Sequence, residues 1–176
     1  MQRVWQASAL VLATALVTVL VNDALGEPAR TSNSGGAVAA VKVVRETTGQ
    51  GNTNPTAWTA VPGATTSITI PAGAKAIILA RFTAESHCQG GSSIDWCSVR
   101  VLIDGTEANP ASGNDFAFQT PGTGFAALAL DRSSGKLSAG PSGKTVSVTV
   151  QQKVTSASTY AWLDDWHLTV ERITTG

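Results

Sequence analysis

Charged residues are scarce in this sequence. The chain has 176 residues with 12 basic and 12 acidic side chains, so its formal net charge is zero and only 14% of its residues are charged. Soluble proteins average about 25%. Because no cluster of lysine or arginine is present to neutralise phosphates, the sequence argues against a nucleic-acid-binding protein. The hydrophobic content of 43% also argues against an intrinsically disordered chain.

Histidine and the common catalytic motifs are nearly absent. His87 and His167 are the only histidines, and no serine stands in the Gly-x-Ser-x-Gly pattern of many serine hydrolases. No phosphate-binding loop, dinucleotide fingerprint or calcium-loop pattern is present. Asp165 and His167 would share one face of a regular strand, but two ligands are too few for a metal site. We therefore expect no catalytic residue, no metal and no cofactor, in a protein that is not an enzyme.

The first 26 residues have the features of a secretory signal peptide. Arg3 gives a positive start, residues 7–21 form an uncharged run rich in Ala, Leu and Val, and Ala24-Leu25-Gly26 offers small residues before a cleavage site. The alternative is an uncleaved membrane anchor. A spanning helix needs about 20 apolar residues, which is more than this run provides.

We therefore expect the signal peptide to be cut after Gly26. Residues 27–36 are small, polar and rich in turn formers, which predicts a flexible leader. The remaining residues, 37–176, are enough for one folded domain. The mature protein is expected to be secreted to the extracellular space and to have no membrane span.

The two cysteines, Cys88 and Cys97, both lie in the part expected to be exported. Exported chains meet an oxidising environment, where cysteines normally pair. Since Gly90-Gly91 offers a turn between them, we expect a disulfide that closes a hairpin between two strands. A zinc site would need more ligands than these two and His87, and the spacing is not Cys-x-x-Cys.

After residue 36 the hydrophobic pattern is that of β-strands. Valines at 146, 148, 150 and 154 alternate with polar residues, which is typical of a strand with one wet face. No stretch keeps an apolar 3.6-residue period for three turns. The expected strands cover residues 37–45, 58–61, 65–70, 74–85, 99–103, 115–120, 125–131, 145–154 and 160–173. Short strands at this spacing, separated by Pro and Gly turns, predict an all-β sandwich or barrel.

The strand expected at 160–173 carries two tryptophans and two consecutive carboxylates. In a regular strand Trp162 and Trp166 share a face with Leu168, so core packing is the expected role of both rings. Asp164 would then lie on the same face and would need a partner such as an arginine. Alternatively, Asp164-Asp165 marks a β-bulge that re-aims one of the carboxylates.

Three of the expected strands are apolar on both faces. They are the segments 37–44, 74–84 and 125–130. A strand that is apolar on both sides requires cover on both sides, and the sandwich core supplies only one. We therefore expect a homo-oligomer in which a second subunit covers the other face.

Three segments resemble a known family. Residues 65–82 (TTSITIPAGAKAIILARF), 99–108 (VRVLIDGTEA) and 137–150 (LSAGPSGKTVSVTV) resemble the jelly-roll domain shared by tumour necrosis factor and the globular heads of complement's first component. The resemblance implies an antiparallel two-sheet β-sandwich of about eight to ten strands with jelly-roll topology. It also implies a homotrimer with a binding or structural role toward an extracellular partner.

The tryptophans offer an alternative function. Exported sandwiches can stack sugars on flat aromatic platforms flanked by carboxylates and amides. Trp58 and Trp96 are the candidates for exposed platforms, and Asp95 adjoins Trp96. The alternative to a self-associating module is therefore a carbohydrate-binding module in which Trp58, Trp96 and Asp95 contact a glycan.

Overall fold

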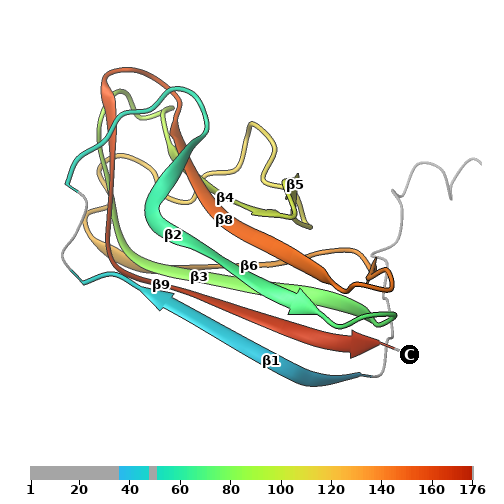
Figure 1. Ribbon diagram of the computed structural model, residues 1–176. Coiled ribbons are helices and arrows are strands. Elements are labelled where there is room, and N and C mark those ends of the chain that lie inside the picture. The colour runs from blue at the N-terminus through green and yellow to red at the C-terminus, as the bar shows by residue number, and fades with distance from the viewer. Residues whose placement is uncertain (1–35, 48–50, 176) are drawn as a thin grey trace, which may run out of the picture. The chain divides into compact units, whose positions relative to one another are not determined.

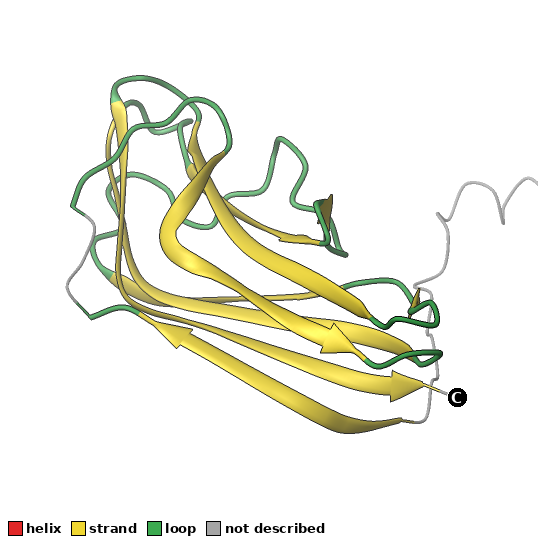
Figure 2. Ribbon diagram, viewed as in Figure 1, coloured by secondary structure: helices red, strands yellow, loops and turns green. Residues whose placement is uncertain are grey.

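The computed structural model describes residues 36–47 and 51–175. The expected signal peptide and all of the expected leader except Gly36 lie outside these residues. Within them every regular element is a strand and no helix occurs, as Figure 2 shows. No helix in the described part of the chain is therefore long and apolar enough to cross a membrane. The nine strands are β1 (Gly36–Arg45), β2 (Thr59–Ile70), β3 (Lys75–Gly90), β4 (Cys97–Ile103), β5 (Thr106–Glu107), β6 (Ala126–Ser133), β7 (Leu137–Ser138), β8 (Lys144–Val154) and β9 (Thr159–Thr175).

The strands form two sheets. The first sheet has the order β1-β9-β3-β6, with the short β7 also paired to β3, and the second has the order β2-β8-β4-β5. All pairs are antiparallel. Figure 1 shows the two sheets as two layers, with β1, β9, β3 and β6 in one layer and β2, β8 and β4 in the other. The prediction of an all-β, antiparallel two-sheet sandwich is confirmed.

The core lies between the inner faces of the two sheets. In β8 the predicted alternation is confirmed, because Val146, Val148 and Val150 are fully buried while Ser147 is exposed. From the opposite sheet Phe82 packs on Trp166 with ring centroids 6.0 Å apart. Burying a side chain of this size contributes about 1.5–3 kcal/mol, so these alternating positions hold the two layers together.

Two expected strands have a different form. Residues 58–61 and 65–70 belong largely to one strand, β2, whose pairing with β8 is irregular between Ala60 and Thr65. Proline is tolerated there because β2 is an edge strand, where the missing amide removes no ladder hydrogen bond. The strand expected at 115–120 is wrong. The amides of Phe118 and Gln119 both donate to the carbonyl of Cys97, so only an isolated bridge forms and no ladder continues.

Candidate functional site

The predicted disulfide is present, but it does not close a hairpin. Cys88 lies on β3 in the first sheet and Cys97 lies on β4 in the second, with their Cα atoms 5.8 Å apart. The strands β3 and β4 do not pair, because each finds its partners within its own sheet. The disulfide therefore joins the two layers of the sandwich. Val154 and Ala161 bury it at one end of the core.

Asp95 holds the loop between these two cysteines. Its carboxylate accepts hydrogen bonds from the backbone N–H of Ser92 at 2.6 Å, from Thr155 Oγ1 at 3.0 Å and from Ser156 Oγ at 3.3 Å. The Ser92 N–H, and then the hydroxyl donors, hold the pKa of Asp95 below its usual value because they favour the charged form. The structure thus ties Asp95 to the β8–β9 turn, a role that sequence reasoning did not foresee.

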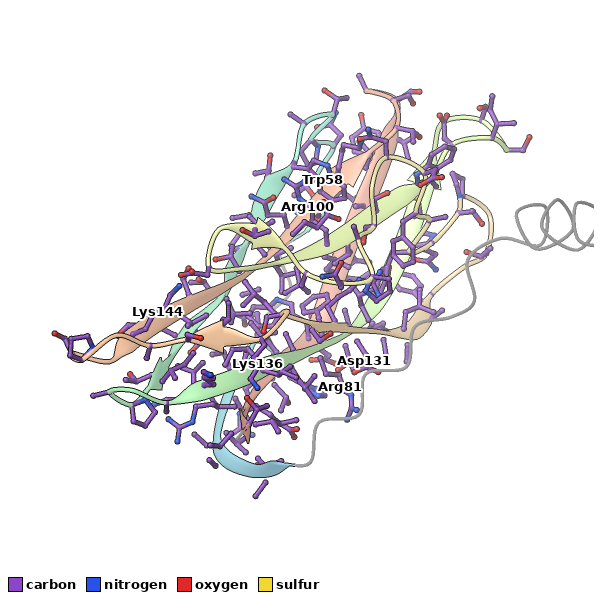
Figure 3. The ribbon with its side chains drawn as sticks, turned by 90° about the vertical axis from the view of Figure 1, so that its right-hand side faces the viewer. Trp58, Arg81, Arg100, Asp131, Lys136 and Lys144 are labelled. Carbon is purple, nitrogen blue, oxygen red and sulfur yellow. A yellow bond between two sulfur atoms is a disulfide. The ribbon has the colours of Figure 1, made fainter. Side chains whose placement is uncertain are left out.

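Trp58 and Trp96, the two predicted platforms, are both half-buried. The Arg100 guanidinium carbon lies 4.4 Å from the centroid of the Trp58 ring and Lys153 Nζ lies 5.2 Å from it. Figure 3 shows the labelled Trp58 beside Arg100. The indole N–H of Trp96 is buried and has no hydrogen-bond partner in the described part of the chain. Binding of a glycan at these two rings stays a prediction.

The two carboxylates of β9 lie at a β-bulge. Between the pairs Thr83–His167 and Glu85–Asp164, β9 has two residues where β3 has one, and Asp165 adopts a positive φ of 42°. Such a bulge adds an unpaired residue and bends the strand. Figure 1 shows β3 and β9 bending together partway along their length.

The bulge reverses the faces of β9, so the prediction that Trp162 and Trp166 share a face is wrong. Trp166 is 1% exposed and lies in the core, whereas Trp162 lies half-buried on the outer face. Asp164 lies on that outer face too, where it accepts a hydrogen bond from the backbone N–H of Asp165 at 2.7 Å. No arginine of the described residues pairs with Asp164. On the outer face water can solvate the carboxylate, so a charged partner is not required.

Trp162 belongs to an aromatic cluster that sequence reasoning missed. Its ring meets the ring of Phe125 edge-on, with centroids 4.6 Å apart and an interplanar angle of 81°. Phe125 also lies 4.5 Å from the His87 ring at an angle of 33°. With Gly51, Asn52 and Gln89 these rings line a shallow pocket of about 330 Å³. The only sequence signal for it is the Asp164-Asp165 bulge, which turns Trp162 outward.

The outer face of the first sheet is apolar at its other end. Pairing places Val38, Ile173 and Ile77 in one row across β1, β9 and β3, and it places Val41 and Leu79 on either side of Glu171 in the next row. The exposed fractions of Val38, Val41 and Val43 are 53%, 51% and 59%. We name these six side chains the apolar patch: Val38, Val41, Val43, Ile77, Leu79 and Ile173.

The middle of this outer face is polar. Arg81 Nε lies 2.6 Å from Asp131 Oδ1 in an ion pair that is more than half exposed, and Figure 3 shows the two side chains together. A cavity of about 290 Å³ adjoins the pair. Such an exposed pair contributes at most about 1 kcal/mol. The pair therefore separates the apolar patch from the aromatic cluster but does little for stability.

The structure assembles no recognisable catalytic centre from the described residues. His167 lies within hydrogen-bond distance of Thr83 Oγ1, at 2.8 Å from Nδ1, and His87 packs on Phe125. Among residues 36–47 and 51–175, no three His, Cys, Asp or Glu side chains gather so that they could hold a metal ion. The arrangement offers surfaces for contact with other molecules.

No family model matches the chain, and a search of curated proteins finds none that is similar to it.

Proposed function

We propose that this chain is a secreted, non-enzymatic jelly-roll module that self-associates through the outer face of its first sheet. The pairs β1–β9, β2–β8, β3–β6 and β4–β5 join the strands as in one long hairpin folded over on itself, when the short β7 is left aside. This order supports jelly-roll topology, which consists of eight strands in two sheets.

The apolar patch carries the self-association proposal. Its three valines lie on β1, an edge strand of ten residues that has only Lys42 and Arg45 as charged residues. Proteins usually protect a long edge strand with charge, proline or a covering element, because its free backbone groups invite pairing. Here apolar side chains continue from the edge through Ile173 on β9 to Ile77 on β3, whereas Glu171 lies between Val41 and Leu79. A second copy of the chain would bury them.

Export and assembly state complete the proposal. A buried disulfide is typical of proteins that fold in oxidising compartments, which supports secretion. The resemblance to the tumour necrosis factor and complement family favours a homotrimer over a dimer. In such a module the assembled surfaces would engage an extracellular protein or glycan.

A charge placed in the apolar patch tests the proposal. Val41→Lys puts an ammonium between Val38 and Val43 in the apolar patch, and Ser67→Lys puts one on β2, an edge strand of the second sheet, as the matched control. Sedimentation velocity at equal concentrations is expected to show Val41→Lys as monomer and Ser67→Lys as the wild-type oligomer. Both should keep the wild-type far-ultraviolet circular dichroism spectrum, since both side chains lie outside the core of the single chain.

Two results would contradict this proposal. One is a wild-type chain that sediments as a monomer at every concentration. The other is an oligomer that Val41→Lys leaves intact, which would place the interface elsewhere.

A further inference from the structure

The aromatic cluster of His87, Phe125 and Trp162 lies at the bent end of the first sheet and remains partly exposed to solvent. Phe125 is 52% exposed although it contacts the rings of both His87 and Trp162. The exposed part of the Phe125 ring contributes no burial free energy to folding, and a ligand that covered it would gain that free energy on binding. The three rings come from β3, β9 and the segment just before β6, so the fold holds them in place from three separate elements.

Polar side chains surround these rings. Asn52 and Gln89 line the same pocket, and neither amide has a hydrogen-bond partner among the residues that the structure describes. Glu85 and Asp164 form the next pair along the same outer face. The pocket therefore combines an aromatic floor with amides that both donate and accept, and the two carboxylates lie beyond its lining on the same face.

We propose that this pocket binds one pyranose ring of a neutral glycan. A pyranose has a flat C–H face that can stack on an aromatic ring, and hydroxyl groups around its edge that need both donors and acceptors. The volume of about 330 Å³ lies at the lower end of the range for small-molecule sites, which suits a single sugar ring of a longer chain. The glycan would extend over the open side of the pocket.

The geometry favours a sugar over a quaternary ammonium group, the other common ligand of aromatic clusters. An ammonium cage surrounds the cation with ring faces. Here the rings of Phe125 and Trp162 are nearly perpendicular, at 81°, whereas those of His87 and Phe125 are inclined by only 33°. The three ring planes therefore have only two distinct orientations. A cage closed on three sides does not form, whereas a stacking face with an adjoining wall does.

This site is separate from the apolar patch. Leu79 in the patch and His87 in the cluster are eight residues apart on β3, which corresponds to about 26 Å along a strand. Glycan binding and self-association can therefore succeed or fail independently. A monomeric chain that binds sugar would contradict only the self-association proposal, and an oligomer that binds no sugar would contradict only the glycan proposal.

Isothermal titration of the purified, oxidised protein tests the proposal. The probes are hexasaccharides of β-1,4-linked glucose, β-1,4-linked N-acetylglucosamine and α-1,4-linked glucose, together with choline. We expect at least one hexasaccharide to bind with a dissociation constant of about 1 mM or tighter. Trp162→Ala and Phe125→Leu should each weaken that binding by about tenfold or more. Phe125→Leu keeps an apolar side chain and removes the ring face, so it separates stacking from general hydrophobic contact.

Phe116→Ala is the matched control, because it removes a half-buried aromatic ring that packs on Arg132 and does not line the pocket. Its affinity for the hexasaccharide should equal that of the wild type. The proposal is overturned if none of the hexasaccharides binds, if choline binds in their place, or if Phe116→Ala rather than Trp162→Ala abolishes binding. Equal affinity of Phe125→Leu and wild type would also overturn it, since stacking would then contribute nothing.

Discussion

Removing the disulfide with Cys88→Ala and Cys97→Ala is expected to lower the free energy of unfolding by about 3–5 kcal/mol. The bond closes a loop with a sequence separation of nine. In the chain-entropy model, a loop of about ten residues restricts the unfolded chain by about 2.7 kcal/mol at 25 °C. The remainder comes from the two buried sulfurs, which pack against Val154 and Ala161 and leave space when they are removed.

Urea unfolding followed by tryptophan fluorescence measures this loss. The wild-type protein with its disulfide reduced is the control, because it keeps both sulfurs and loses only the chain restriction. It should be destabilised by about 2.7 kcal/mol, less than the double variant. Amide hydrogen exchange should become faster near the β3 and β4 ends that the bond joins, and should change least at the opposite end of the sandwich. A loss below about 1 kcal/mol in the double variant would refute the reasoning.

The remaining predictions concern single side chains, measured by the same unfolding assay. Trp166→Ala should cost about 3–5 kcal/mol because its ring is buried against Phe82, while Trp162→Ala should cost about 1 kcal/mol or less; equal losses would contradict the bulge. Asp165→Gly should be neutral or stabilise by up to about 1 kcal/mol, since glycine adopts a positive φ freely, and Asp165→Val should destabilise by about 1–2 kcal/mol; the reverse order would refute the assigned backbone. The lowered pKa of Asp95 means that its stabilising contribution is complete above the ordinary pKa of about 3.9 and is lost as pH falls through the lower folded value. The free energy of unfolding of Asp95→Asn should therefore fall less than that of the wild type between about pH 5 and pH 2, the range around the ordinary pKa of an aspartate. A variant with the same pH profile as the wild type would contradict the hydrogen bonds assigned to Asp95.

Regular alternation made most of the fold predictable. The valines of β8 fit a period of two, so the inner face of this strand followed directly from the sequence, whereas β3 is apolar on both faces and its inner face did not. The segment 115–120 failed because its alternation resembles a strand, whereas its amides at Phe118 and Gln119 share one acceptor. Local pattern carries no information about which carbonyl a distant amide will meet.

The candidate sites were harder to predict because they depend on long-range register. The sequence left open whether Asp164-Asp165 forms a bulge or part of a regular strand. The bulge that forms places Trp166 in the core and Trp162 on the outer face. The contact of Phe125 with His87 and Trp162 joins segments far apart in the sequence. Two cysteines in a chain expected to be exported predicted the bond but not that it joins two sheets, because the turn-rich loop between them suggested a hairpin.

The solution mass of the purified wild-type chain tests the central claim most directly. Multi-angle light scattering across a concentration series should give a mass three times that of one chain, as expected for association through the apolar patch. A mass equal to that of one chain at the highest concentration would contradict the account.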